Sequence, residues 1–180
     1  AIATVALQYS IAAGLPFFSE DYTQLTVAAT QSSFVDALSP ELVPLRPLQH
    51  LFTYWEHVFA NEVPAVARIP GFAMHLGSCF LVYLLARRLE VGVLGAALAM
   101  VLYATFPNAK SIIWTAAIGW PGRQLFVLAS LLAFLHNAKR PSRFAALGCV
   151  ATFVIALGFH QGAFLLPGFA AVLGFYVVEK

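Results

Sequence analysis

Six long apolar segments recur along this chain, and four of them carry no charged side chain. They cover residues 1–18, 69–86, 91–106, 122–138, 143–159 and 162–178. Charged residues make up 10% of the sequence, whereas about 25% is usual for a soluble domain. An unpaired backbone amide is costly in lipid, so each segment is expected to be helical. The pattern predicts an all-α polytopic membrane protein, with about six transmembrane helices in a single transmembrane domain over residues 1–180.

The last two segments meet at residues 158–162, within Gly158-Phe-His-Gln-Gly162. Residues 143–178 are too many for one crossing of the roughly 30 Å hydrocarbon layer. A tight hairpin is therefore favoured over one long kinked helix.

Basic residues in short loops predict the orientation, because such loops tend to stay on the cytoplasmic side. Two crossings separate the two basic clusters, so both are expected on that side. The clusters are Arg87 and Arg88, then Lys139, Arg140 and Arg143. The outer face then holds residues 19–68, residues 107–123 and the turn at His160.

The outer segment, residues 19–68, has the pattern of amphipathic helices. One helix is expected over residues 22–38, capped by Ser19 or Asp21. A second is expected over residues 48–60, with apolar residues at helical spacing: Leu48, Leu51, Phe52, Trp55 and Phe59. Its other face carries Gln49, His50, Thr53, Glu56 and His57, and this face is expected to be solvated rather than to bind a metal. Both helices are expected to lie in the membrane interface.

Charge and cysteine content exclude several classes of protein. The net charge of +2 is too small and too dispersed for nucleic-acid binding. Cys79 and Cys149 lie in apolar segments, where they fit packing rather than a disulfide framework. The chain begins with Ala1 and ends just after an apolar segment, so a fragment of a longer polypeptide is expected.

Two adjacent acids follow the first apolar segment, in Phe17-Phe-Ser-Glu-Asp-Tyr22. Glu20 and Asp21 are candidates for binding a divalent cation, and either is a candidate base for an attacking hydroxyl. The alternative is helix capping, because acids in a first helical turn interact favourably with the helix dipole.

Cationic residues of the outer face are candidates for binding a phosphate. Arg46 lies between Pro44 and Pro47 and is suited to clamp a phosphate, to pair with Asp21 or to contact lipid headgroups. Residues 107–123 add two cations and two indoles that suit a lipid phosphate or an ordinary aromatic belt: Lys110, Trp114, Trp120 and Arg123. His160 is placed to reach the same region, whereas His75 fits a hydrogen bond within the membrane.

In order, these pieces resemble the N-terminal membrane portion of GT-C-type glycosyltransferases, especially the protein O-mannosyltransferase-like members. The resemblance begins with Phe18-Ser-Glu-Asp-Tyr22 and Leu45-Arg-Pro-Leu48. It continues through residues 72–89, which contain His75 and end in Arg-Arg-Leu, and then through Phe106-Pro107, Trp114 and Arg123. Phe106 stands where the family carries His, and His160-Gln161 replaces a basic-acidic turn.

The resemblance implies sugar transfer from a polyprenyl-phosphate carrier at the outer face of a membrane, such as a bacterial inner membrane. It implies that Asp21 or Glu20 is the catalytic acid-motif residue, as a base or as a ligand of Mg²⁺ or Mn²⁺. Carrier-phosphate contacts are expected from Arg46, Lys110, Arg123 and His160. The expected partners are the lipid bilayer, a polyprenyl-phosphate sugar and other membrane subunits. The alternative is a non-catalytic integral membrane subunit of a larger complex; a channel or transporter fits less well, because the segments carry few polar residues.

Overall fold

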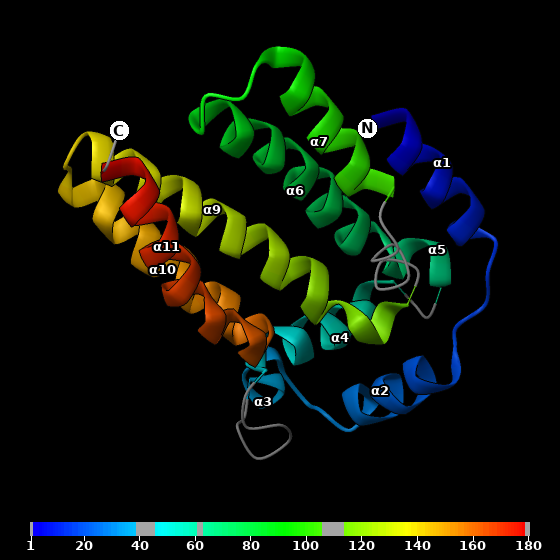
Figure 1. Cartoon of the computed structure of the whole chain (residues 1–180). Helices are drawn as coiled ribbons and strands as arrows, with labels where there is room; N and C mark the ends of the chain where they lie inside the picture. The colour runs from blue at the N-terminus through cyan, green and yellow to red at the C-terminus, as the bar shows by residue number, and fades with distance from the viewer. Residues whose placement is uncertain (1, 39–45, 61–62, 106–113, 179–180) are drawn as a thin grey trace.

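The computed structural model describes residues 2–38, 46–60, 63–105 and 114–178, and these residues form helices without any strand (Figure 1). This confirms the all-α fold. The elements are α1 Ile2–Ala13, α2 Ser19–Ala29, α3 Phe34–Ala37, α4 Pro47–Phe59, α5 Pro64–Ala67, α6 Ile69–Arg88, α7 Val93–Thr105, η2 Thr115–Ala117, α9 Gly119–Lys139, α10 Arg143–Phe159, η3 Gln161–Leu165 and α11 Leu166–Val178.

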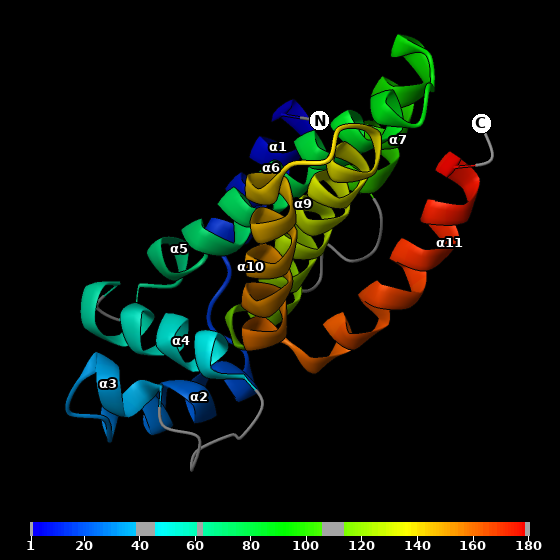
Figure 2. The ribbon, with the colours of Figure 1, turned by 90° about the vertical axis from the view of Figure 1, so that its left-hand side faces the viewer.

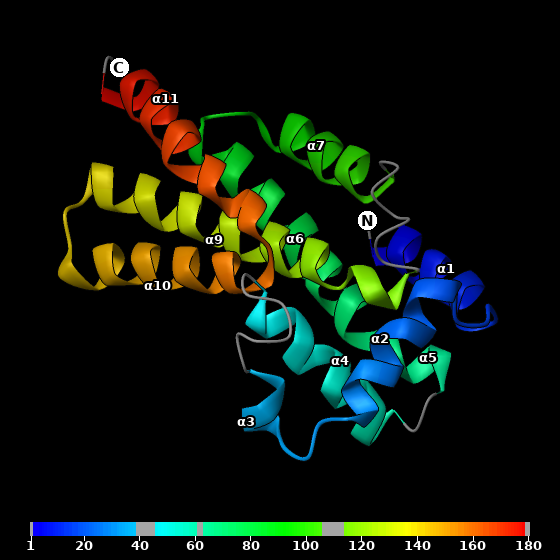
Figure 3. The ribbon, with the colours of Figure 1, turned by 90° about the horizontal axis from the view of Figure 1, so that it is seen from below.

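The longer helices form a bundle, and the helices of the outer segment lie across one end of it. Helix α9 packs against α6 and α10, and α6 also packs against α7. Figure 2 shows α2, α3 and α4 lying crosswise at this end, and Figure 3 views the same end from below. We call it the outer end. The chain therefore brings residues from α2, α4, α9 and the α10–α11 turn close together.

Prolines and hydroxyl groups explain where several helices begin. Pro47 and Pro64 occupy the first turns of α4 and α5, where a missing N–H costs nothing. The continuous helix expected over residues 22–38 is wrong, because α2 ends at Ala29 and α3 begins at Phe34. The Ser33 hydroxyl accepts the Asp36 N–H at 3.2 Å, and this local cap starts the new helix.

The chain reverses its direction at His160. Helix α10 ends at Phe159, and His160 has an extended backbone with φ −165° and ψ 131°. Its Nδ1 accepts the Gly162 N–H at 3.0 Å. Figure 2 shows α11 leading back from the end at which α10 finishes. The arrangement is that of the expected hairpin rather than of one kinked helix.

Within the part of the chain that the structure describes, one run of residues, Pro64–Arg88, is both long and apolar enough to cross a membrane. Other apolar helices are shorter, such as α1, α7 and α10. At about 1.5 Å per residue, α6 reaches about 30 Å, whereas α1 falls well short of that length. The first expected segment reached residue 18, but Gly14 and Pro16 end α1 at Ala13.

The two basic clusters lie at the same end of the bundle, opposite α2 and α4. Arg88 Nη2 lies 3.4 Å from Nδ1 of His136, which is in the last turn of α9. Lys139 pairs with Glu90 across 3.7 Å at the exposed surface. These contacts bring the two turns together at one end of the bundle, and the cytoplasmic location of the clusters stays a prediction.

Candidate functional site

Helix α4 places its polar face inward at the outer end. Gln49, Thr53 and Glu56 are buried, whereas Val58 and Phe59 are exposed. The expectation of a solvated polar face is wrong for these three residues, because α4 packs that face against α2. The apolar stripe of α4 is not turned outward as a whole, because Phe52 packs on Phe159 of α10 with ring centres 5.4 Å apart, whereas Phe59 at the end of the helix is exposed.

Asp21 is a buried anchor between α2 and η2. Its side chain is 1% exposed. Oδ2 accepts the Phe18 N–H at 2.8 Å, and Oδ1 accepts the Ala116 N–H at 2.6 Å. The bond to the Phe18 N–H caps the start of α2, which was the alternative role expected for this acid. The bond to the Ala116 N–H joins segments 95 residues apart. Glu20, one residue earlier, is exposed.

Gln49 extends this anchor from η2 into α4 and α9. Its Nε2 donates to the Ala116 carbonyl oxygen at 2.9 Å. The backbone of Ala116 therefore binds both side chains, Asp21 through its N–H and Gln49 through its carbonyl oxygen. Gly119 begins α9 directly beside it. A Cβ on Gly119 would lie 2.6 Å from Gln49 Oε1 and 2.7 Å from the Phe159 carbonyl oxygen. The close approach of α4, α9 and α10 therefore depends on a glycine at this position.

Glu56 and Arg68 are buried ionisable residues of the same end. Arg68 is 1% exposed and donates to the carbonyl oxygens of Ala12, Leu15 and Pro16 at 2.6–2.7 Å. Glu56 is 2% exposed, and its Oε1 has no hydrogen-bond partner among the described residues. Burial and the nearby Asp21 carboxylate raise the pKa of Glu56 well above its usual value, although Arg68 opposes the shift.

The raised pKa of Glu56 predicts a loss of stability at higher pH. The folded protein keeps a proton that the unfolded chain releases near its ordinary pKa of 4.5, so this stabilisation is lost as the pH rises through the folded pKa. We expect Glu56→Gln to raise the melting temperature at about pH 8 and to change it little at about pH 4. Thermal unfolding in detergent measures this, with Glu20→Gln as the exposed control. Parallel pH profiles for the wild type and Glu56→Gln would contradict the prediction.

Arg46, Arg123 and His160 converge at the outer end, although distant segments supply them. Arg46 Nε donates to Gln161 Oε1 at 2.8 Å across 115 positions of sequence. A Cβ on Gly162 would overlap the Arg123 guanidinium and lie 3.1 Å from His160 Nδ1. We call Arg46, Arg123, His160 and Gln161 the cation cluster.

Trp120 covers part of the cation cluster. The Arg123 guanidinium carbon lies 4.7 Å from the centre of the indole ring, and the His160 ring centre lies 5.0 Å from it. Burial, followed by the positive charges of Arg46 and Arg123, lowers the pKa of His160 to about 4. The neutral imidazole accepts the Gly162 N–H, which leaves two guanidinium groups as the charges of the cluster.

The structure thus brings together three of the four residues expected to contact a phosphate. Lys110 lies outside the described residues. Arg46 uses its Nε on Gln161, and Asp21 uses both oxygens on backbone N–H groups, so the alternative pairing of Arg46 with Asp21 does not occur. Gly119 lies between Gln49, which shares Ala116 with Asp21, and Phe159, the residue before His160 of the cation cluster.

The cation expected at Glu20 and Asp21 does not fit the carboxylate of Asp21. Both of its oxygens already accept backbone N–H groups, and its side chain is buried. Among the described residues no group of three or more His, Cys, Asp and Glu side chains could hold a metal ion. Binding of Mg²⁺ or Mn²⁺ stays a prediction from the sequence, and we derive no step from it.

Four residues important to this end were missed as site residues: Gln49, Glu56, Arg68 and Gln161. Gln49 and Arg68 bond backbone groups more than 50 positions away in the sequence, and Glu56 is defined by its burial, so no short motif records these roles. Inside the bundle, His75 is buried, with Nε2 3.9 Å from Cys79 Sγ and its ring stacked on Tyr103. This is the packing role expected for it.

Comparison with known proteins gives no matching family model, no matching curated protein and no matching solved structure.

Proposed function

We propose that the chain is the membrane-embedded N-terminal part of a GT-C-type glycosyltransferase, which takes a sugar from a polyprenyl-phosphate carrier at the outer face. The observation that carries this proposal is the convergence of Arg46 and Arg123 beside the neutral His160. No carboxylate is bonded to either guanidinium within the described part of the chain. Planar guanidinium groups bind phosphate oxygens in pairs, so an uncompensated pair suits a phosphate.

We further propose that α1, α6, α7, α9, α10 and α11 all cross the bilayer, as a multi-pass protein of a bacterial inner membrane. Support comes from large apolar side chains on the bundle surface, such as Leu94 at 85% and Phe144 at 87% exposure. Water would disfavour so large an apolar surface, whereas lipid accepts it. Tilting and local thinning of the bilayer would accommodate the shorter helices.

In the proposed reaction, an acceptor hydroxyl attacks the anomeric carbon of the lipid-linked sugar from the side opposite the phosphate. The bond from this carbon to the phosphate oxygen breaks, and the configuration inverts. Glu20, exposed in the first turn of α2, takes the hydroxyl proton. Arg46 and Arg123 stabilise the negative charge of the departing polyprenyl phosphate. Asp21 acts through its bond to Ala116, as a positioning residue that fixes η2 against α2.

Binding of a polyprenyl phosphate tests the proposal. We expect Arg46→Gln with Arg123→Gln to weaken binding to the full-length protein in nanodiscs by about 100-fold, because charge-assisted hydrogen bonds contribute about 1.5–3 kcal/mol each. Arg87→Gln with Arg88→Gln is the matched control at the opposite end, and neutral polyprenol is the control ligand. Equal affinities of the two double variants would contradict the proposal.

A second candidate is a non-catalytic integral membrane subunit that packs in a larger membrane complex. The burial of Asp21 and its use by two backbone amides favour this candidate. The same measurement separates the two, because a subunit without a carrier site would bind polyprenyl phosphate and neutral polyprenol with equal affinity.

A further inference from the structure

The two turns at the end of the bundle opposite α2 and α4 carry a concentration of basic side chains (Figure 1). Residues 87–91 and 136–143 contain five of the ten Lys and Arg residues of the chain but one of its eight acids, Glu90. All five cations are exposed: Arg87, Arg88, Lys139, Arg140 and Arg143. We call residues 87–91 and 136–143 the basic surface.

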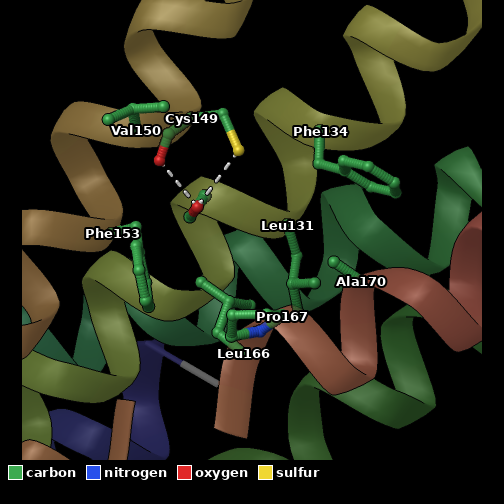
Figure 4. Close-up of a pocket in the computed structure, with 9 residues that line it drawn as sticks. Leu131, Phe134, Cys149, Val150, Phe153, Leu166, Pro167 and Ala170 are labelled. Atoms are coloured by element: carbon green, nitrogen blue, oxygen red, sulfur yellow. Dashed lines mark hydrogen bonds between the residues drawn. The ribbon is translucent and has the colours of Figure 1, made fainter. Parts of the chain in front are cut away.

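The backbone under the basic surface is held by hydrogen bonds. Asn137 Oδ1 accepts the Ser142 N–H at 2.9 Å, which fixes the turn between α9 and α10. Farther along the same two helices, the Ser130 hydroxyl donates to the Cys149 carbonyl oxygen at 2.8 Å and ties α9 to α10 (Figure 4). The cations of this turn are thus presented on an ordered backbone, so less conformational entropy is lost when they bind a ligand.

Three of the five cations have no counter-ion from the protein. Lys139 pairs with the Glu90 carboxylate at 3.7 Å, and Arg87 donates to a carbonyl oxygen of its own turn at 2.9 Å. Within the described part of the chain, no carboxylate pairs with the other three, which are Arg88, Arg140 and Arg143.

These three guanidinium groups come from neighbouring positions of the two turns. Arg88 Nη2 lies 3.4 Å from Nδ1 of His136. His136 is one helical turn before Arg140, whose N–H donates to the His136 carbonyl oxygen at 2.9 Å. Arg143 follows three residues later, at the start of α10. One anionic group can therefore be contacted from both turns.

The helix dipole accounts for only part of this charge. Arg87, Arg88 and Lys139 lie in the last turns of α6 and α9, where cations are favourable. Arg143 instead begins α10, where the dipole favours an acid, and the first turn of α10 contains none. The positive charge at this turn thus exceeds what the helix ends require, and an anion from outside the chain would compensate it.

Large apolar side chains are exposed directly beside the cations, on the helices that leave the two turns. They are Val93 and Leu94 at the start of α7, and Phe144 and Leu147 at the start of α10. A ligand that has both a phosphate and hydrocarbon chains matches this neighbourhood of guanidinium groups and apolar side chains, whereas a soluble anion matches the guanidinium groups alone.

We propose that the basic surface binds the headgroup of an anionic phospholipid. The guanidinium groups of Arg88, Arg140 and Arg143 bind the phosphate, and the acyl chains lie along the exposed apolar side chains of α7 and α10. The site lies at the opposite end of the bundle from the cation cluster. It rests on the proposed crossing of the bilayer and does not depend on sugar transfer.

The test measures binding of phosphatidylglycerol to the full-length protein in detergent, with native mass spectrometry counting the bound lipid molecules. Phosphatidylcholine is the zwitterionic control lipid. We expect Arg140→Gln with Arg143→Gln to weaken phosphatidylglycerol binding about 30-fold, because each cation near an anionic lipid contributes a factor of about five. Glu90→Gln should strengthen binding about fivefold, since it removes the single acid of the surface. A gain in affinity cannot result from loss of the fold.

Arg46→Gln with Arg123→Gln removes the same charge at the outer end and should have little effect. Equal weakening by this pair would overturn the site, because binding would then follow net charge alone. Equal binding of phosphatidylcholine, or displacement of phosphatidylglycerol by inorganic phosphate at the same concentration, would overturn recognition of a lipid headgroup. A protein that does not stay inserted in phosphatidylcholine nanodiscs would contradict the membrane crossing on which the site rests. Binding that responds to Arg140, Arg143 and Glu90 alone supports the site whether or not the chain transfers sugar.

Discussion

Replacing Arg68 with alanine should prevent the protein from accumulating in a folded form. The Arg68 guanidinium is buried and donates to three carbonyl oxygens, that of Ala12 in the last turn of α1 and those of Leu15 and Pro16 just after it. Hydrogen bonds from charged groups contribute about 1.5–3 kcal/mol each. Their combined loss exceeds about 4 kcal/mol, a large part of the roughly 5–15 kcal/mol that stabilises a typical domain.

Size-exclusion chromatography of a fluorescent fusion measures this effect in unpurified detergent extracts. Arg87→Ala is the matched control, because its exposed guanidinium bonds a single carbonyl oxygen, that of Val91, at the opposite end. Arg68→Lys should restore only part of the folded peak. An ammonium group can still donate to a carbonyl oxygen, but it lacks the planar fork that spans several carbonyls. A monodisperse Arg68→Ala peak of wild-type height would refute the structural role of this residue.

Sequence patterns predicted the helices well where the apolar runs end in strong local signals. Residues 69–86 became α6 Ile69–Arg88, because the apolar run stops at the two arginines. The helix expected from residue 48 begins at Pro47, a residue that favours the first turn. The prediction of one continuous helix over residues 22–38 was wrong, because Ser32 and Ser33 bond Asp36 and start a separate turn. Such local bonds compete with a continuous helix.

The spacing of polar and apolar residues did not predict which face of a helix packs against the rest of the protein. Helix α4 has two clearly different faces, but the pattern is the same whether the apolar face meets a protein core or lipid. The role of Arg68 could not be predicted for a different reason, because its carbonyl partners lie 52–56 residues earlier in the sequence. By contrast, the sequence did point to Arg46 through its flanking prolines, to Arg123 through its neighbouring tryptophans and to His160 through its place at a turn, although it gave no information on their spatial arrangement.

The two adjacent acids should respond differently to neutralisation in a sugar-transfer assay of the full-length protein. Glu20 is exposed, so Glu20→Gln should leave the melting temperature unchanged and lower turnover by about 100-fold or more, the usual contribution of a general base. Asp21→Asn should instead lower the stability by about 1–3 kcal/mol. The asparagine oxygen can accept one of the two backbone N–H groups, but its NH₂ group then faces the other donor.

Turnover per folded molecule separates a positioning role from a chemical one. For Glu20→Gln this quantity should fall by the full 100-fold or so, and Glu20→Asp should recover part of it, because a shorter carboxylate is still a base. For Asp21→Asn the Michaelis constant for the carrier should rise while turnover per folded molecule falls much less, since η2 and Gln49 lose their anchor rather than a proton acceptor. Full turnover in Glu20→Gln would remove that residue as the base. A loss of turnover confined to Asp21→Asn, at unchanged stability, would assign the chemistry to Asp21 and require its carboxylate to leave the Ala116 amide during the reaction.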